Sequence, residues 1–280
     1  MAKIIKIWLF VLILGLFSVA KGQEKNQDTG KWPLPKSFVN PKVNRIDYKE
    51  NLAPFFDKLS AYETAVQAGG DLVHRPKVLM IGDSHVRGNI LPRQVRDSLK
   101  NEWAIDFKYL CKNGVQLQYF LKKALMDSIV SFKPDLLIVA VGTNEAHSNF
   151  DSEKYTMLMC EFTNQVLAGT DSSTTIMFTT PPGSHVKKGR AAKGKKKGYA
   201  SVVPNNTNKV VADCQDKFCK ENGFAIWNLL DIAGGECAPR NWRVARLMQH
   251  DGVHYTVDAY KLQGNMLAWA LIDARNSMRQ

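Results

Sequence analysis

Residues 77–88 read Lys-Val-Leu-Met-Ile-Gly-Asp-Ser-His-Val-Arg-Gly, an apolar run that leads directly into a polar turn. A short run that is apolar at every position and ends at a glycine predicts a strand buried on both faces of a parallel sheet. Gly82 permits the chain to turn sharply out of that strand. The polar residues that follow therefore lie at the carboxyl edge of the sheet, where open α/β sheets bind their ligands.

Ser84 is the candidate nucleophile of this turn. The turn would lift its hydroxyl clear of the sheet and leave its backbone N–H at the start of the next helix. The same residues also fit an ordinary strand-to-helix loop in which Ser84 caps the helix. Asp83 is expected to hold the turn or to cap the helix, and not to take part in the chemistry. A motif this short does not choose between the two interpretations, so partners elsewhere in the chain must decide.

Apolar strands and helical patterns alternate along the rest of the chain. The predicted strands cover residues 78–81, 105–110, 136–141, 175–180 and 224–227. The predicted helices cover residues 51–67, 90–99, 117–130, 155–167, 208–221 and 257–275. This alternation predicts an α/β fold with a five-stranded parallel sheet and helices on both faces. The stretch 183–204 is left as a long basic loop, which indicates either function or disorder.

The N-terminal 22 residues predict a secretory signal peptide. Lys3 and Lys6 precede an apolar run at residues 7–17, and Ala20-Lys21-Gly22 has the small-x-small pattern of a cleavage site. The apolar run is too short to span a membrane. We therefore expect cleavage near Gly22 and an extracytoplasmic protein, periplasmic or secreted, with no membrane span after cleavage.

Two further segments are expected after the cleavage site. Residues 23–45 are polar and contain three prolines, so they predict an extended N-terminal arm. Residues 46–280 suit a single domain with a sizeable core. The five cysteines show neither a CxxC pair nor a spacing typical of zinc, so we expect no structural metal. Nothing in the sequence predicts a cofactor.

The formal net charge is +12, and it stays near +9 once the leader, which holds three lysines and no acid, is removed. Seven basic residues fall in the loop 183–204. A basic surface favours an anionic partner such as a cell-envelope polymer, whereas a solvated loop needs no partner. Nucleic acid is not expected, because the charge is clustered, lacks interleaved aromatic residues and belongs to an exported protein.

Two further predicted strands also end in polar turns. Gly114 follows the second strand and Asn144 follows the third. Since parallel strands end at the same edge of a sheet, both turns are expected to lie near Ser84. The backbone N–H groups of Ser84 and Gly114 and the side-chain amide of Asn144 are donors of the kind that an oxyanion hole requires.

A second motif, His250-Asp251-Gly252-Val253-His254, precedes the last predicted helix. A serine hydroxyl is a weak nucleophile that needs a base within hydrogen-bond distance. His254 supplies an imidazole for that role, and Asp251 can orient it and stabilise its protonated form. Taken alone, the motif also fits an exposed turn. The order of the motifs along the chain favours a Ser84–His254–Asp251 triad.

Together these motifs resemble the SGNH or GDSL-type hydrolases, a family named after its Ser, Gly, Asn and His residues. Gly82-Asp83-Ser84-His85 is similar to the first block, with His where the signature has Leu. Gly114 is similar to the second block, Gly142-Thr143-Asn144 to the third and Asp251-Gly252-Val253-His254 to the last. The resemblance spans residues 77–272. It implies a flavodoxin-like three-layer fold and hydrolysis of acyl esters through a covalent acyl-enzyme, without metal or cofactor.

One branch of that family is particularly similar. His85 after the nucleophile, Glu145 after Asn144 and the stretch Asn241-Trp242-Arg243 resemble exported bacterial acylhydrolases that act on acetylated carbohydrate. The candidates for substrate contacts are His85, Glu145, His147 and Trp242. Each also has a structural interpretation. His85 could make a structural hydrogen bond, and Glu145 could brace the site through a hydrogen bond. His147 could lie at the surface, and Trp242 could pack in the core.

These observations predict an exported serine esterase that removes acyl groups, O-acetyl above all, from a carbohydrate such as peptidoglycan. Two alternatives keep the same fold. An O-acyltransferase would pass the acyl group to a sugar hydroxyl instead of water. A non-catalytic binder would use the basic loop to hold an anionic cell-envelope glycan.

Overall fold

The computed structural model describes residues 43–69, 74–170, 172–188 and 201–279. The predicted signal peptide, all but the last three residues of the predicted arm and residues 189–200 of the basic loop lie outside the described residues. Everything described belongs to one unit, Leu34–Gln280, and the single domain from residue 46 stays a prediction. Within the described ranges, no helix combines the length and apolar character that crossing a bilayer requires.

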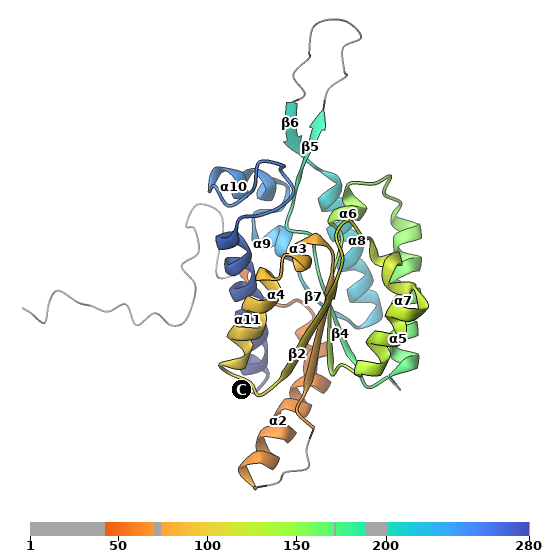
Figure 1. Ribbon diagram of the computed structural model, residues 1–280, viewed down its shortest axis with the longest axis vertical. Helices are drawn as coiled ribbons and strands as arrows, with labels where there is room; N and C mark the ends of the chain where they lie inside the picture. The colour runs from red at the N-terminus through yellow and green to blue at the C-terminus, as the bar shows by residue number, and fades with distance from the viewer. Residues whose placement is uncertain (1–42, 70–73, 171, 189–200, 280) are drawn as a thin grey trace, which may run out of the picture. The chain divides into compact units, whose positions relative to one another are not determined.

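Five parallel strands form the central sheet in the order β2-β1-β3-β4-β7 (Figure 1). The strands are β1 (Lys77–Gly82), β2 (Asp106–Cys111), β3 (Leu136–Ala140), β4 (Thr175–Thr179) and β7 (Ala225–Trp227). The prediction of a five-stranded parallel sheet is therefore confirmed. The chain runs from β1 outward to β2 and then returns to β3 on the other side of β1. Such a switch point opens a crevice beyond the carboxyl ends of β1 and β3.

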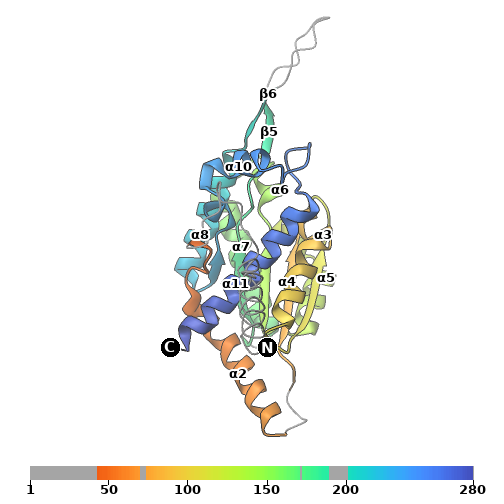
Figure 2. The ribbon, with the colours of Figure 1, turned by 90° about the vertical axis from the view of Figure 1, so that its left-hand side faces the viewer.

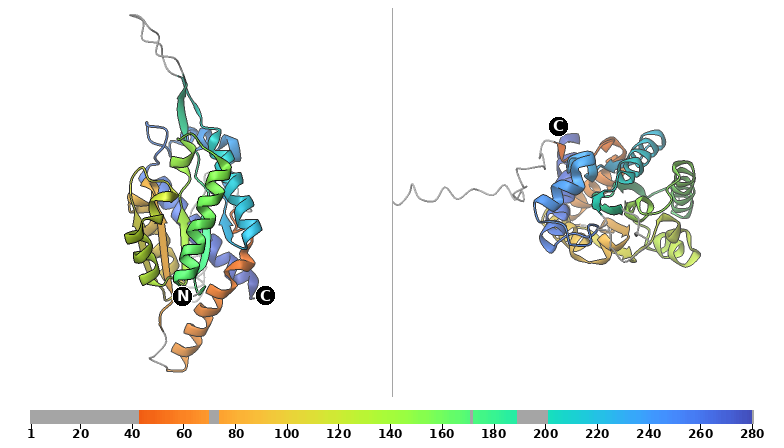
Figure 3. Two further views of the ribbon diagram at one scale, coloured as in Figure 1. Left: turned by 90° about the vertical axis from the view of Figure 1, so that its right-hand side faces the viewer. Right: turned by 90° about the horizontal axis from the view of Figure 1, so that it is seen from above.

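Helices cover both faces of the sheet and give it three layers (Figures 1 and 2). The helices are α2 (Ala53–Gln67), α3 (Ser84–Arg87), α4 (Ile90–Lys100), α5 (Lys123–Phe132), α6 (Thr143–Ala146), α7 (Ser152–Gly169), α8 (Thr207–Asn222), α9 (Leu229–Ile232), α10 (Ala238–Val244) and α11 (Val257–Met278). Short 3₁₀ turns are η2 (Lys49–Leu52), η3 (Leu117–Leu121) and η4 (Gly235–Cys237). α4 and α11 pack together on one face of the sheet, and α5, α7 and α8 lie on the other (Figure 3).

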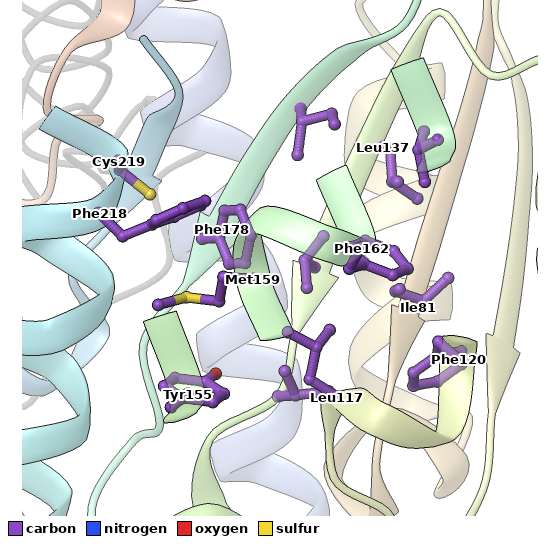
Figure 4. Packing of buried hydrophobic residues seen from close by; sticks show 14 of the residues in the cluster. Ile81, Leu117, Phe120, Leu137, Tyr155, Met159, Phe162, Phe178, Phe218 and Cys219 are labelled. Carbon is purple, nitrogen blue, oxygen red and sulfur yellow. The ribbon is translucent and has the colours of Figure 1, made fainter. Parts of the chain in front are cut away.

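The sheet is buried on both faces, which explains why its strands read as unbroken apolar runs. Leu79 and Ile81 of β1 join a large apolar cluster with side chains such as Phe162 of α7 (Figure 4). Val78 and Met80 alternate with them toward the opposite face and are at most 1% exposed. Burying a side chain of this size contributes about 1.5–3 kcal/mol. This double burial holds β1, and therefore the polar turn at its end, in place.

One predicted helix is interrupted. Residues 117–130 form the 3₁₀ turn η3 and then α5, and Lys122 between them is extended, with φ −61° and ψ 131°. The backbone N–H of Leu117 donates to the buried Glu145 side chain at 2.7 Å. This tertiary contact fixes where the segment starts. The helical periodicity of the sequence does not reveal such a contact.

The predicted loop 183–204 contains a β-hairpin. β5 (His185–Lys188) pairs antiparallel with β6 (Ser201–Pro204) beyond the carboxyl edge of the sheet (Figure 1). The sequence predicted only a loop here, and the two strands are a difference from that prediction. Each strand has only four residues, His-Val-Lys-Lys in β5 and Ser-Val-Val-Pro in β6. Patterns this short do not alternate clearly enough to predict a strand.

α4 and α11 meet at Gly264, where a side chain would have no room. A Cβ there would lie 2.7 Å from the Cβ of Gln94 and 3.0 Å from the carbonyl oxygen of Leu91. We expect Gly264→Ala to lower the free energy of unfolding by about 1–3 kcal/mol, because overpacking outweighs the roughly 1 kcal/mol by which alanine favours a helix over glycine.

Urea unfolding measures this change. Asn276→Ala, at an exposed position of the same helix, is the control and should shift stability by less than about 0.5 kcal/mol. Equal stability of Gly264→Ala and the unmodified protein would show that close contact at this position does not limit the packing.

Candidate active site

The candidate nucleophile follows directly from the end of β1. Gly82 has no room for a side chain, since a Cβ would lie 2.7 Å from the carbonyl oxygen of Ala140 in β3. Asp83 then caps α3, because its Oδ1 accepts the backbone N–H of His85 at 2.9 Å. The alternative in which Ser84 caps this helix is therefore wrong. The Ser84 hydroxyl is left for another partner.

That partner is the imidazole of His254. Its Nε2 lies 2.9 Å from Ser84 Oγ, and its Nδ1 lies 2.7 Å from Asp251 Oδ2. A carboxylate only accepts hydrogen bonds, so Nδ1 carries a proton that it donates to Asp251. In the neutral ring, Nε2 is then the acceptor that faces the Ser84 hydroxyl.

Asp251 is held as an ionised carboxylate. Its Oδ1 accepts the backbone N–H groups of Val253 and His254, both at 2.9 Å. Partial burial opposes ionisation, but these bonds and the one from the His254 ring together hold the pKa of Asp251 below its ordinary value. The ionised form, which accepts the hydrogen bond from the imidazole, is thus favoured.

Contacts from the base of the hairpin fix the loop that carries Asp251 and His254. Gly252 has φ +74° and packs against the side chain of His185, whose backbone N–H donates to the Gly252 carbonyl at 2.7 Å. The buried Tyr255 hydroxyl donates to the carbonyl of Gly183 at 2.5 Å. These contacts join the loop to β5 on one side, and α11 begins directly after it.

Asn144 and Gly114 lie at the other side of the nucleophile turn. The Asn144 amide donates to Asp83 Oδ2 at 3.1 Å and to the carbonyl of Val115 at 2.9 Å. Gly114 has φ +70°, is exposed and lines a groove of about 570 Å³ together with Asn144 and His147. Both hydrogens of the Asn144 amide are thus engaged. An oxyanion would have to share one of them.

Two buried carboxyl groups support this edge of the sheet. Burial raises the pKa of Asp83 to about 7, with a further contribution from the nearby charge of Glu145. Burial likewise raises the pKa of Glu145 to about 7. Glu145 Oε1 accepts the N–H of Leu117 at 2.7 Å, and the Gln116 amide donates to the carbonyl of Asn144 at 3.2 Å. The segment around Gly114 is therefore tied to α6.

Three of the residues expected to contact substrate are buried instead. Trp242 is 0% exposed, and its indole N–H donates to the carbonyl of Pro182 at 3.1 Å. Glu145 is 4% exposed and braces the segment after β2, as described above. His85 is 7% exposed, and its Nδ1 lies 3.0 Å from the hydroxyl of Tyr260. Burial leaves these three side chains little or no surface for a substrate, so the structure favours the structural interpretation of each one.

His85 lies behind the candidate triad. Its ring centroid is 5.6 Å from that of His254. Burial, reinforced by the neighbouring His254, lowers the pKa of His85 to about 3, so the ring is neutral at ordinary pH. A neutral His85 ring packs against His254 without adding a positive charge beside it.

His147 is the fourth expected contact, and it lines the groove. Its Nε2 lies 2.8 Å from the buried Ser184 hydroxyl at the base of the hairpin. The groove also contains Gln116, Tyr119 and Lys122, which the sequence did not single out. Tyr119 and Lys122 lie on a segment predicted as continuous helix and Gln116 directly precedes it, so no sequence signal connected them with the nucleophile.

The ionisation of Glu145 should reduce stability as the pH rises. The folded protein holds the Glu145 proton more tightly than the unfolded chain, so the cost of ionisation develops between the ordinary pKa of 4.5 and about 7. Glu145→Gln keeps the oxygen that accepts from Leu117 but cannot ionise. Between about pH 5 and pH 8, we expect Glu145→Gln to lose about 1–3 kcal/mol less unfolding free energy than the unmodified protein loses.

Urea unfolding at the two pH values measures this difference. Glu102→Gln removes an exposed carboxyl and should follow the unmodified protein. If Glu145→Gln loses as much stability as the unmodified protein over the same range, Glu145 is not the source of the pH dependence.

Comparisons with known proteins identify the family of this chain. The model of the family described as GDSL-like lipase/acylhydrolase matches residues 78–267, about two thirds of the chain. Comparison with curated proteins gives no match. Among solved structures, a peptidoglycan O-acetylesterase is similar with a TM-score of 0.67 and 15% identity, over 80% of this chain and 96% of its own.

Two further solved structures are similar at lower scores. TesA gives a TM-score of 0.51 at 14% identity, over 71% of this chain and 99% of its own. A GDSL-like lipase from Bacteroides thetaiotaomicron gives 0.48 at 14% identity, over 79% and 99%. At these identities the peptidoglycan O-acetylesterase and TesA, whose TM-scores exceed 0.5, show a shared fold, and the family match adds the chemistry. The chain belongs to the GDSL-like lipase/acylhydrolase family and is an ester hydrolase of the SGNH type.

Proposed function

We propose that the protein is an exported serine esterase that removes O-acetyl groups from a carbohydrate, with Ser84, His254 and Asp251 as its catalytic triad. One observation carries this proposal. A continuous chain of hydrogen bonds runs from Ser84 Oγ through both ring nitrogens of His254 to Asp251. This is the arrangement that activates a serine hydroxyl for acyl transfer.

The first half of the reaction forms an acyl-enzyme. Ser84 Oγ attacks the ester carbonyl carbon while His254 Nε2 accepts the hydroxyl proton. The bond to the sugar oxygen then breaks, and that oxygen leaves as a hydroxyl with the proton from His254. In the second half, water attacks the acyl group and gives its proton to His254. Ser84 is released with that proton, and acetate is the product.

The oxyanion of each tetrahedral intermediate needs preorganised N–H donors. The Ser84 amide lies in the first turn of α3, where backbone N–H groups lack partners within the helix. The Gly114 amide and the Asn144 side chain are the other two proposed donors. Because both Asn144 hydrogens already have acceptors, we expect the two backbone amides to provide most of the stabilisation.

Two observations support a carbohydrate ester as the substrate. The groove beside Gly114 has a volume of about 570 Å³, within the range of small-molecule sites, and is lined by amide, hydroxyl, imidazole and ammonium groups that suit sugar hydroxyls. A solved structure of the same fold is a peptidoglycan O-acetylesterase, which makes acetylated peptidoglycan the first substrate to test. The leader-like N-terminal sequence supports action outside the cytoplasm.

Loss of the nucleophile should abolish hydrolysis. We expect Ser84→Ala and His254→Gln to lower kcat for p-nitrophenyl acetate by about 10³-fold or more, and Asp251→Asn to have a large effect through misorientation of the imidazole. Ser131→Ala and His74→Gln, both at exposed positions outside the candidate site, are the matched controls. Wild-type turnover by Ser84→Ala would remove the serine from the mechanism.

A fluorophosphonate probe tests the same assignment without a substrate. We expect a covalent adduct on Ser84, mapped by mass spectrometry, that is absent in Ser84→Ala and strongly slowed in His254→Gln, because the probe reacts with activated serines. Product analysis with acetylated peptidoglycan and an added acceptor sugar separates hydrolysis from transfer. Free acetate supports the esterase, and acetylated acceptor as the main product contradicts it.

A further inference from the structure

The groove beside the candidate oxyanion site contains no carboxylate. Its lining residues are Gly114, Val115, Gln116, Gln118, Tyr119, Lys122, Asn144 and His147. The lining thus combines neutral hydrogen-bonding groups with one ammonium. Such a surface attracts negative charge in whatever occupies it.

Two lysines converge on the aromatic ring in this groove. The Nζ atoms of Lys112 and Lys122 lie 5.0 Å and 4.9 Å from the centre of the Tyr119 ring. The two ammonium groups are therefore at most about 10 Å apart, which is comparable to the screening length of physiological salt. Like charges at this separation repel unless an anion lies between them.

Neither of these lysines makes an ion pair within the part of the chain that the structure describes. The neighbouring Lys123 does, since its Nζ lies 2.8 Å from Asp127 Oδ2. Lys58 is paired with Asp135 at 2.7 Å. An acid in the substrate would supply the counter-charge that Lys112 and Lys122 lack.

The backbone of Lys112 adjoins the strand that leads to the nucleophile. The backbone N–H of Lys112 donates to the carbonyl of Gly82, two residues before Ser84, because β1 and β2 are neighbours in the sheet (Figure 1). Arg87, the last residue of α3, interacts electrostatically with Cys111, the residue before Lys112. The same edge of the sheet thus presents positive charge and the Ser84 hydroxyl together.

We propose that the ester substrate is an acidic glycan, and that Lys112 and Lys122 bind a carboxylate within one sugar unit of the acylated position. The inference rests on the proposed esterase function and names the class of its substrate. Both ammonium groups approach the Tyr119 ring, which adds an aromatic side chain to this part of the groove. The carboxylate is remote from the bond that breaks, so it contributes to binding in the ground state and the transition state alike.

Paired substrates test this proposal. One is an O-acetylated uronic-acid oligosaccharide, and the other is the same compound with its carboxyl groups converted to methyl esters. Acetate release is measured for the full chain and for Lys112→Gln, Lys122→Gln and the double variant. We expect the unmodified protein to favour the acidic form by about tenfold or more in kcat/KM, mainly through KM, and the double variant to lose that preference.

The controls separate charge from structure. Lys122→Arg keeps the charge and should keep the preference. Lys123→Gln, which loses only an exposed pair with Asp127, should do the same. About 0.5 M salt should reduce the preference in the unmodified protein. Turnover of p-nitrophenyl acetate by Lys123→Gln should be unchanged, because Lys123 does not line the groove.

The outcomes distinguish this inference from the proposed function. If p-nitrophenyl acetate is hydrolysed but the two oligosaccharides react equally, or the double variant keeps the preference, the acidic-glycan inference is overturned and the esterase stands. If no ester is hydrolysed, the proposed function fails. Calorimetric binding of the acidic oligosaccharide to Ser84→Ala, with and without Lys112→Gln and Lys122→Gln, then decides the inference. Binding that does not weaken in the lysine variants overturns it.

Discussion

The hydrogen bond between Ser84 Oγ and His254 Nε2 joins two residues that are 170 positions apart in the chain, and the site depends on keeping its 2.9 Å length. One such bond contributes only about 1 kcal/mol, too little to hold two loops together. Packing provides the positioning instead. β1, buried on both faces, fixes Ser84, while α11 packed on α4 and the contact between His185 and Gly252 fix His254.

The buried polar groups beneath the site also help to position it. Burying a carboxyl group is costly, and Asp83 and Glu145 are both buried with raised pKa values. Each of them ties one segment to another. Asp83 caps α3 and accepts from Asn144, and Glu145 holds Leu117. The result is that the ends of β1, β2 and β3 are joined by hydrogen bonds at the edge where the proposed chemistry takes place. These buried carboxyl groups lower the stability of the fold, and their hydrogen bonds hold the strand ends in position.

The lysines give the groove a positive charge that the family fold alone does not supply. A fold of this kind accommodates many acyl substrates, so the residues around the nucleophile must select among them. Lys112 and Lys122 beside Tyr119 lie on the segments that follow β2, and loops at strand ends are where such folds vary without disturbing the sheet. On this proposal, substrate choice and catalytic geometry depend on different parts of the same edge.

The amino-acid sequence was enough to predict the alternation of strands and helices, the family and the residue types at the strand ends, because apolar periodicity and short motifs are local properties. It also predicted that Ser84 and Asn144 follow strands of one parallel sheet, as they do. Contacts in the folded chain were needed to show that Trp242, Glu145 and His85 are buried, that the Asp83 carboxylate caps α3, and that Lys112 and Lys122 approach one ring. Burial and pairing depend on contacts between distant segments, and no local pattern in the chain records them.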